Sequence, residues 1–172
     1  IAQAAVNSGT SIARAFEKSV HTAFSLLRYD TKLLGQGAGR EPDGIALAPD
    51  DSYAVIWDAK SRSDTYALGT DDRAIKEYIS RYSRKLRRQC RNIYFLIVSG
   101  CFQSDFEDNI TELKMETDVN EVSLMEAGAL VSIVAIYLHS PLEFSLGPDG
   151  LQRLFANPQG IITQQTVSNF FG

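Results

Sequence analysis

The sequence predicts an α/β fold, in which a β-sheet is flanked by α-helices. Three short runs rich in strand-forming residues, 45–48, 53–57 and 93–99, indicate the sheet. Two longer stretches, 12–28 and 75–86, repeat apolar residues at the spacing of an amphipathic helix. Strands and helices that alternate along one chain are typical of a sheet covered by helices.

The length and composition fit one soluble domain. A chain of 172 residues is long enough to bury a core, so we expect a single domain over 1–172, and 44 % apolar with 22 % charged residues is ordinary for a soluble protein. Residues 1–11 are small and polar, which indicates a weak helical lead-in or a linker remnant. The first residue is Ile1 rather than methionine, so we expect a piece of a longer protein.

The sequence argues against membrane, secretory and disulfide-rich classes. The longest apolar run, 127–138, is too short to span a bilayer, and the first residues lack the basic and hydrophobic regions of a signal peptide. Cys90 and Cys101 form neither a disulfide framework nor a metal-ligand spacing. We therefore expect buried thiols in a cytosolic protein.

The net charge of −4 hides an uneven distribution of charged residues. The average argues against binding of nucleic acid by bulk charge. However, the segment 73–91 is basic with one acid, Glu77, whereas 105–126 is acidic with one base, Lys114. A charged run on a helix is usually a solvated face, but a basic one also suits a DNA backbone, so both interpretations stay open for 81–91.

The first expected helix, 12–28, carries Glu17 at the margin of its apolar stripe. A carboxylate in that position is usually a surface group. It gains a chemical role only if the helix packs across the following hairpin and directs Glu17 toward Asp43 and Asp58. The glycine-rich stretch 33–39 is either a flexible loop or a backbone that can approach a phosphate closely, and it lacks the spacing of a nucleotide-binding loop.

The stretch 40–60 is expected to form a turn, a strand, a second turn and a second strand. Residues two apart in a strand share one face, so Asp58 and Lys60 lie on the same side of the second strand. Asp43 enters the hairpin from the other strand. Two carboxylates and one ammonium group can therefore converge.

That grouping suits a divalent cation. Two neighbouring carboxylates repel each other unless a cation that prefers oxygen ligands lies between them, and a nearby lysine can orient a water or stabilise charge on a phosphodiester. By itself the pattern is weak, because many strands carry Asp-x-Lys as solvated edge charges.

The remaining elements follow from the same rules. We expect Asp71 or Asp72 to cap the helix over 75–86, and 93–99 to be a buried central strand. The rest is expected to comprise a helix over 105–114, a strand-and-helix connection over 119–126, a strand or buried helix over 129–138, and short helices over 151–155 and 161–171, with breaks at Gly147-Pro148 and Asn157-Pro158.

A series of short motifs runs through the chain from residue 16 to 134. It comprises Phe16-Glu17, Leu33-Leu34-Gly35-Gln36-Gly37, Pro42-Asp43-Gly44, Val55-Ile56-Trp57-Asp58-Ala59-Lys60, Tyr66-Ala67-Leu68, Glu77-Tyr78-Ile79 and Phe95-Leu96-Ile97-Val98-Ser99-Gly100-Cys101-Phe102. In this order the motifs resemble the cleavage domain of FokI-like type IIS restriction endonucleases, and Pro-Asp followed by Asp-x-Lys resembles the PD-(D/E)xK nuclease signature. Each motif is modest, but the series is much more specific.

The resemblance implies a restriction-endonuclease-like mixed β-sheet flanked by α-helices, with the active site at one edge. By match to the motif, Asp43 and Asp58 would be metal carboxylates, Lys60 the catalytic lysine, and Glu17 an additional acid near the metal. The implied cofactor is Mg2+, for which Mn2+ could substitute. The implied activity is cleavage of double-stranded DNA without intrinsic sequence specificity, in the bacterial cytoplasm, with recognition supplied by a domain or subunit outside this chain.

The resemblance also implies a weak or DNA-dependent homodimer, in which Arg73 and Glu77 pair across the two-fold axis; an ordinary pair within the helix is the alternative. The residues expected to contact DNA are Lys32, Gly35, Arg40, Arg62, Arg81, Arg84 and Lys85. Two rival functions remain. One is another nuclease of the same superfamily, such as a repair or junction-resolving enzyme, and the other is a non-catalytic DNA-binding or dimerisation module.

Overall fold

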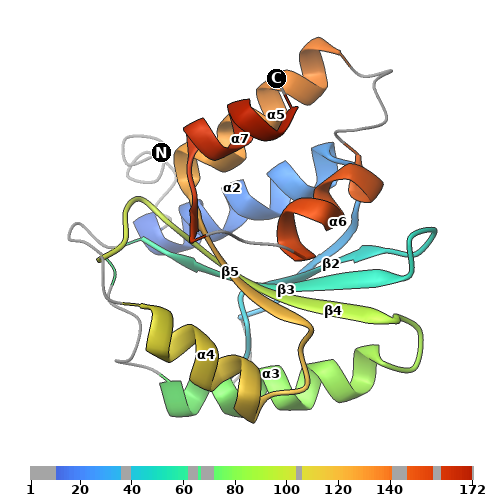
Figure 1. The fold of residues 1–172 in the computed structure, drawn as a ribbon, viewed down its shortest axis with the longest axis vertical. Helices are drawn as coiled ribbons and strands as arrows, with labels where there is room; N and C mark the ends of the chain where they lie inside the picture. The colour runs from blue at the N-terminus through green and yellow to red at the C-terminus, as the bar shows by residue number, and fades with distance from the viewer. Residues whose placement is uncertain are drawn as a thin grey trace.

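A computed structural model describes residues 11–35, 40–61, 66, 72–103, 106–140, 147–156 and 160–171. It contains a six-stranded sheet with helices on both faces, as Figure 1 shows. The strands are β1 (Asp30–Leu33), β2 (Gly44–Ala48), β3 (Tyr53–Lys60), β4 (Asn92–Ser99), β5 (Glu121–Glu126) and β6 (Ile161–Ile162). The helices are α2 (Ile12–Leu26), α3 (Asp72–Leu86), α4 (Glu107–Glu116), α5 (Ala127–His139), α6 (Pro148–Ala156) and α7 (Gln164–Phe171).

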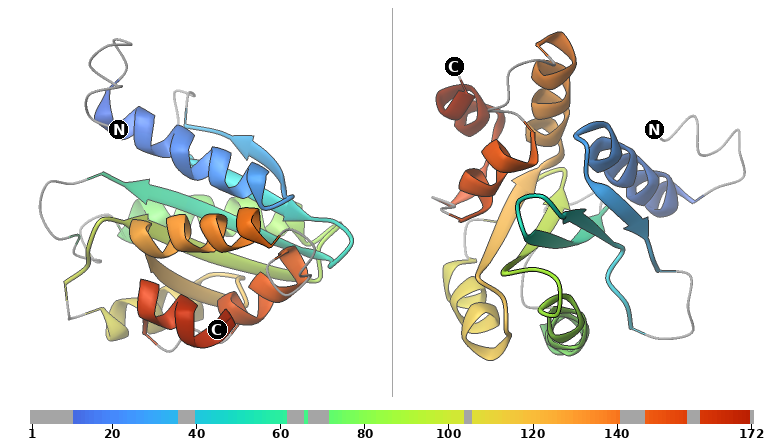
Figure 2. Two further views of the ribbon diagram at one scale, coloured as in Figure 1. Left: turned by 90° about the horizontal axis from the view of Figure 1, so that it is seen from above. Right: turned by 90° about the vertical axis from the view of Figure 1, so that its right-hand side faces the viewer.

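The sheet is mixed, and its strands follow one another in chain order. β1, β2 and β3 pair antiparallel, whereas β3, β4, β5 and β6 pair parallel. Tight turns can join only antiparallel neighbours, so the parallel half needs crossovers, and α3 and α4 supply two of them on one face. Helices α2, α5, α6 and α7 cover the opposite face (Figure 2). This is the mixed, helix-flanked sheet expected from the sequence.

Strand β3 is buried on both faces, which explains its continuous apolar run. Tyr53, Val55 and Trp57 belong to the core under α2 and α5, while Ala54 and Ile56 belong to the core under α3 and α4. The alternation continues along the strand, so Asp58 and Lys60 emerge on the α3 face. The sequence of β3 thus delivers two charged groups to the end of an otherwise apolar strand.

Gly44 allows the two strands of the hairpin to approach closely. A Cβ at this position would lie 2.2 Å from Cζ2 of Trp57 and 2.8 Å from the carbonyl oxygen of Lys32. Trp57 is fully buried, so its ring has no room to move aside. The absence of a side chain at Gly44 lets Trp57 pack beneath β2 and keeps Asp43 next to β3.

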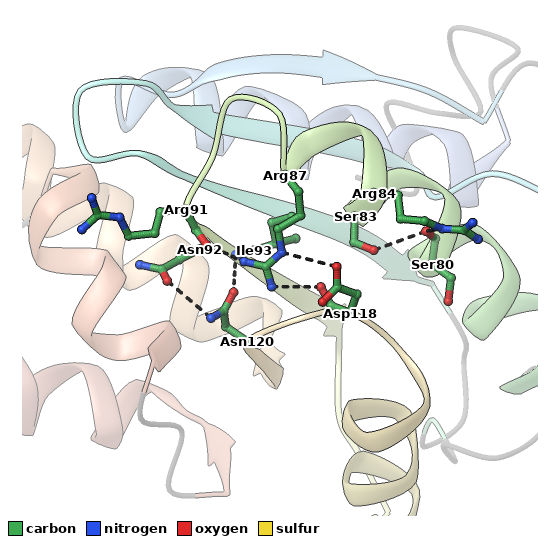
Figure 3. Close-up of polar contacts among 9 residues, drawn as sticks. All are labelled: Ser80, Ser83, Arg84, Arg87, Arg91, Asn92, Ile93, Asp118 and Asn120. Carbon is green, nitrogen blue, oxygen red and sulfur yellow. Dashed lines mark hydrogen bonds and ion pairs between the residues drawn. The ribbon is translucent and has the colours of Figure 1, made fainter.

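A polar network links the segments that precede β4 and β5, at the end of the sheet where these two strands begin (Figure 3). Arg87 donates to the carbonyl oxygens of Arg91 and Asp118, and Asn120 accepts from the Ile93 amide at 2.7 Å. Arg87 also forms an ion pair with the Asp118 carboxylate at 3.5 Å. This network binds the loop after α3 to the start of β5, so Arg87 has a structural partner in the acidic segment.

Two elements differ from the sequence-based expectation, and a third, 129–138, takes the buried-helix form of its two expected alternatives. β1 was not expected, because this edge strand is short, half-exposed and without an apolar run. The run 129–138 is the helix α5 rather than a strand, since its buried residues recur at helical spacing and it runs for 13 residues. The segment 119–126 contains the strand β5, and its expected short helix does not form there.

The C-terminal part of the chain also differs from the sequence-based expectation at two places. Pro148 begins α6 rather than separating two elements, because the first helical position needs no backbone N–H. Ile161–Ile162 pairs with β5 as β6, so the helix expected from 161 begins at Gln164.

Of the two cysteines, both expected to be buried, Cys90 is buried but Cys101 is exposed.

The other expected elements are confirmed, with small shifts at their ends: α2, the β2–β3 hairpin, α3, β4 and α4. Residues 1–10, Asp71 as a helix cap, Arg62 and Asp105 lie outside the described residues. None of the described helices has the length and hydropathy needed to cross a bilayer.

Candidate active site

The β2–β3 hairpin holds Asp43 and Asp58 against each other at its open end. The Asp43 amide donates to Oδ1 of Asp58 at 3.2 Å, and the Ala59 amide donates to Oδ2 of Asp43 at 2.7 Å. Each aspartate side chain is therefore held by the backbone of the opposite strand. Asp58 is only 2 % exposed, whereas Asp43 is half-buried.

Two further side chains bind Asp58 at its second oxygen. The Lys60 ammonium lies 3.0 Å from Oδ2, and the hydroxyl of Tyr78 on α3 donates to the same atom. Burial alone would lower the pKa of Lys60, but the Asp58 carboxylate outweighs it and raises that pKa above its usual value. In the metal-free site Lys60 is therefore a cation that can donate hydrogen bonds.

Glu17 approaches the site from the other side of the sheet. Helix α2 packs on β1 and β3, and Arg14 on its first turn donates both to Glu17 and, at 3.1 Å, to the carbonyl oxygen of Leu34. This contact fixes the first turn of the helix beside the segment that precedes Asp43. After burial and the Asp58 carboxylate, the negative charge of Glu17 adds a smaller contribution that raises the pKa of Asp43. The convergence of all three carboxylates stays a prediction.

The pKa of Asp43 is raised by its burial and by the negative charges around it. Burial and the neighbouring Asp58 carboxylate raise the pKa of Asp43 from 3.8 to about 7. The Ala59 amide and Lys60 act in the opposite direction but are outweighed. The Asp43 carboxyl is thus poised between its protonated and ionised forms near neutral pH.

This arrangement fits a divalent cation. A cation bound to Asp43 and Asp58 would remove their mutual repulsion, and carboxylate oxygens are the ligands that Mg2+ prefers. No group of three or more His, Cys, Asp and Glu residues within the described segments is close enough to hold a metal. The fit therefore rests on the two aspartates, and Glu17, which Arg14 already binds, stays a predicted additional ligand.

We expect Asp43 to make the metal-free protein less stable as pH rises. The folded state holds the Asp43 proton more tightly than the unfolded state, so its contribution to the free energy of unfolding is complete below about pH 4 and is lost as pH rises through about 7. The whole difference is at most about 4 kcal/mol. Urea unfolding of the wild type and Asp43→Asn at pH 5 and pH 8, with EDTA present, should show the variant gaining relative stability at pH 8. A stability difference that is the same at both pH values would contradict the Asp43 assignment.

The expected DNA-binding residues that the structure describes lie on β1, on the segment before β2, and on α3; Arg62 lies outside the described residues. Lys32 is exposed on β1, and Gly35 has a φ of 74° next to the Asp43 carboxylate. Arg81, Arg84 and Lys85 are exposed on α3. Arg81 also donates to the carbonyl oxygen of Arg40 at 2.6 Å, which joins α3 to the segment before Asp43.

Arg73 and Glu77, the expected dimer pair, are both exposed on α3. Glu77 forms an ion pair with Arg40 at 3.5 Å, so the expected alternative of a simple pair within the helix is not the contact that Glu77 makes. With both side chains more than 60 % exposed, this ion pair contributes little to stability.

Two residues of the candidate site, Tyr78 and Arg14, were not predicted from the sequence. Tyr78 was expected in the apolar stripe of its helix, where its ring does belong, and was quoted in one of the short motifs without a role at the site. Nothing in the spacing signals that its hydroxyl reaches Asp58. Arg14 precedes the first quoted motif and sits on a helix with few charges. A basic residue one turn before Glu17 was the only available signal.

A separate hollow of about 540 Å3 lies between α2 and α5, on the far face of the sheet. Its lining is apolar apart from Lys18 and a few hydroxyl groups, and it includes Phe16, Leu130 and Val134. It does not include Asp43, Asp58 or Lys60. The hollow therefore lacks the groups that hydrolysis of a phosphodiester needs, and it is distinct from the carboxylate site.

The mixed sheet and the cluster of Asp43, Asp58 and Lys60 at the open end of the β2–β3 hairpin define a domain of the restriction-endonuclease-like class. A family model described as "FokI, cleavage domain" matches residues 2–161. The chain belongs to this family, whose members are DNA-cleaving nuclease domains. No curated protein sequence matches the chain.

Solved structures share the fold. The structure of restriction endonuclease FokI has a TM-score of 0.71 and 23 % identity, and the structure of FokI bound to DNA has a TM-score of 0.70 and 22 % identity. Each match covers 88 % of this chain but 28 % of the FokI chain. The small subunit of the heterodimeric restriction endonuclease R.BspD6I has a TM-score of 0.62 and 14 % identity, and that match covers 82 % of this chain and 76 % of the subunit.

Proposed function

We propose that this chain is a Mg2+-dependent endodeoxyribonuclease domain that hydrolyses phosphodiester bonds of double-stranded DNA without reading their sequence. The observation that carries the proposal is the contact between Asp43, Asp58 and Lys60 at the end of the β2–β3 hairpin, in a chain of the FokI cleavage-domain family. A site degraded to a scaffold would not need to keep two repelling carboxylates so close together.

Each residue of the site has a separate proposed role in the hydrolysis. Asp43 and Asp58 would hold Mg2+, which supplies the positive charge that offsets the charge developing on the phosphate. Lys60 is protonated, so it positions the attacking water and stabilises negative charge by donating hydrogen bonds. Glu17 assists from α2 by adding negative charge beside Asp43.

The exposed basic side chains of α3 supply a surface for the DNA backbone. Arg81 and Lys85 lie over the ring of Tyr82, at 5.3 and 5.2 Å from its centre, so their charges are held near the helix surface. The acidic helix α4 lies beside α3, where Glu112 and Glu116 both bind Lys76. The acids of α4 are therefore partly neutralised, and Arg81, Arg84 and Lys85, with Lys32, Gly35, Arg40 and Arg62, form the proposed DNA contacts.

Cleavage of supercoiled plasmid tests this function. The protein is incubated at high concentration with and without Mg2+, and we expect conversion to nicked and linear DNA only when the metal is present. Because the FokI structures are much longer than this chain, a separate domain is proposed to bring the nuclease to DNA. A fusion to an unrelated DNA-binding domain should therefore cut faster, and a fusion that binds DNA but leaves it intact would contradict the proposal.

A homodimer is the proposed assembly for cutting both strands. The small subunit of R.BspD6I is named as part of a heterodimeric enzyme, and α3 of this chain offers two exposed residues of opposite charge, Arg73 and Glu77. In a two-fold arrangement each residue would meet its opposite on the second copy. Exposed pairs contribute about 0–1 kcal/mol each, so the dimer is expected to be weak and to form mainly on DNA.

Glu77→Arg should weaken this dimer about tenfold, because it replaces two attractions with two repulsions. Analytical ultracentrifugation with a short DNA duplex measures the dimerisation constant, and linearisation of plasmid measures double-strand cleavage. The double reversal Arg73→Glu/Glu77→Arg should restore both. Unchanged dimerisation in Glu77→Arg would exclude this interface.

The rival functions give different results in the same assays. A repair or junction-resolving nuclease would prefer branched over linear duplex DNA, whereas the proposed domain should cut both at similar rates. A non-catalytic module would bind DNA without Mg2+-dependent cleavage under any fusion. The bacterial cytoplasm remains the location predicted for a nuclease of this kind.

A further inference from the structure

Tyr78 contacts the proposed metal site from outside the hairpin. Three donors surround the Asp58 carboxylate: the Asp43 amide at Oδ1, and the Lys60 ammonium and the Tyr78 hydroxyl at Oδ2. Asp43 immediately precedes β2 and Lys60 is the last residue of β3, whereas Tyr78 belongs to α3. Tyr78 is therefore the side chain by which α3 holds Asp58.

The ring of Tyr78 is fixed, which makes its hydroxyl a directional donor. Tyr78 is 5 % exposed and packs edge-on against Phe95 of β4, with 6.3 Å between the ring centres. Tyrosine has two side-chain torsions, so a buried ring leaves the hydroxyl little freedom beyond rotation of its own proton. The Asp58 oxygen that it binds is held in one direction.

Lys60 cannot provide the same restraint. Its long side chain is 22 % exposed, and in the proposed mechanism its ammonium group must donate to water or phosphate at the reacting centre. When Lys60 turns to these groups, Asp58 loses part of that contact. Tyr78 then remains as the fixed donor to Oδ2, so the carboxylate keeps its orientation toward the cation.

We propose that Tyr78 is a positioning residue of the active site, whose hydroxyl fixes the orientation in which Asp58 receives the divalent cation. This inference rests on the proposed function. Groups that hydrogen-bond to a metal ligand typically change metal affinity or activity by about 10- to 100-fold when removed. Tyr78 should act at that level through Asp58, without touching DNA.

The test compares Tyr78→Phe with Tyr94→Phe. Phenylalanine keeps the ring of Tyr78 and its contact with Phe95, and removes only the hydroxyl. Tyr94 is a matched control, because it is 4 % exposed, accepts a hydrogen bond from Gln152 at 3.4 Å and belongs to the core on the opposite face of the sheet. Thermal unfolding of both metal-free variants verifies that each is folded.

We expect Tyr78→Phe to bind Mn2+ about 10- to 100-fold more weakly than the wild type in a calorimetric titration, and Tyr94→Phe to bind it normally. Plasmid cleavage by Tyr78→Phe should need a correspondingly higher metal concentration and should recover at saturating Mn2+. If the Tyr78 hydroxyl were purely structural, Tyr78→Phe would have a lower unfolding temperature and an unchanged affinity for Mn2+.

The outcomes separate this inference from the function on which it rests. If the wild type binds Mn2+ and cuts DNA while Tyr78→Phe behaves like Tyr94→Phe, the role of Tyr78 is wrong and the nuclease assignment stands. If Tyr78→Phe keeps normal Mn2+ affinity but cuts slowly at every metal concentration, the proposal that Tyr78 positions the metal ligand is also wrong. A wild type that neither binds Mn2+ nor cuts DNA would overturn both.

Discussion

Asp58→Asn is expected to reduce DNA cleavage by at least about a thousandfold. The removal of a group that merely hydrogen-bonds to a metal ligand costs about 10- to 100-fold, and loss of the negative charge of the ligand itself should cost more. The change also weakens the anchor of Lys60, whose ammonium lies 3.0 Å from Oδ2 of Asp58. Initial rates of plasmid nicking at saturating Mg2+ measure the effect.

Asparagine at this position retains the shape of the side chain and one oxygen acceptor, so the fold should survive. Asp50→Asn is a matched control, because Asp50 is exposed in the turn at the other end of the same hairpin. Both variants should bind a DNA duplex as the wild type does in the absence of metal. If Asp58→Asn cut DNA within about tenfold of the wild-type rate, Asp58 would not be a metal carboxylate.

Lys60→Ala is expected to slow cleavage by about 100- to 1000-fold while leaving metal binding largely intact. Removal of one preorganised donor to developing negative charge typically costs this much. The alanine variant loses the ammonium that positions water, but Asp43 and Asp58 remain to hold the cation. Single-turnover cleavage rates and Mn2+ affinity, measured on the same preparation, should therefore respond differently.

Lys60→Arg tests whether charge alone is sufficient. Arginine keeps the positive charge but presents a planar group in place of a compact ammonium, so only partial activity is expected. Lys114→Ala, which removes a lysine that binds Glu121 on another part of the surface, should cut at the wild-type rate. Loss of Mn2+ binding in Lys60→Ala would show that Lys60 maintains the site rather than assisting the reaction.

The sequence was most informative where local pattern and burial agree. The apolar run of β3 and its charged end placed Asp58 and Lys60 on one face, and the turn at Pro42-Asp43-Gly44 placed Asp43 opposite them; the structure brings all three together. These positions depend on neighbours in sequence and on the two-residue period of a strand. The order of motifs then indicated the family that the comparison confirms.

What the sequence could not provide are contacts between elements far apart in the chain. The Tyr78 hydroxyl reaches Asp58 only because α3 packs on that face, and its apolar ring alone accounts for its place in the stripe. Arg14 reaches the carbonyl oxygen of Leu34 only because α2 packs against the sheet. The two-residue strand β6 was missed for the same reason, because it is defined by its partner in β5.

The helix α5 shows that hydrophobic periodicity alone cannot distinguish a buried helix from a buried strand. An uninterrupted apolar run fits a buried strand or a buried helix equally well, and length is the better guide. At 13 residues α5 is long for a strand, and its outward residues Val131 and Leu138 are also apolar, which removes the amphipathic signal of a surface helix. Both residues line the hollow between α2 and α5.

The central claim is that the β2–β3 hairpin binds a divalent cation between Asp43 and Asp58. Calorimetric titration of Mn2+ into the DNA-free protein at pH 8 tests it most directly, because at that pH Asp43, with its pKa of about 7, is largely ionised. We predict saturable binding by the wild type that is weaker at pH 6 and absent in Asp58→Asn. Binding of equal strength in Asp58→Asn, or no binding by the wild type at pH 8, would contradict the claim.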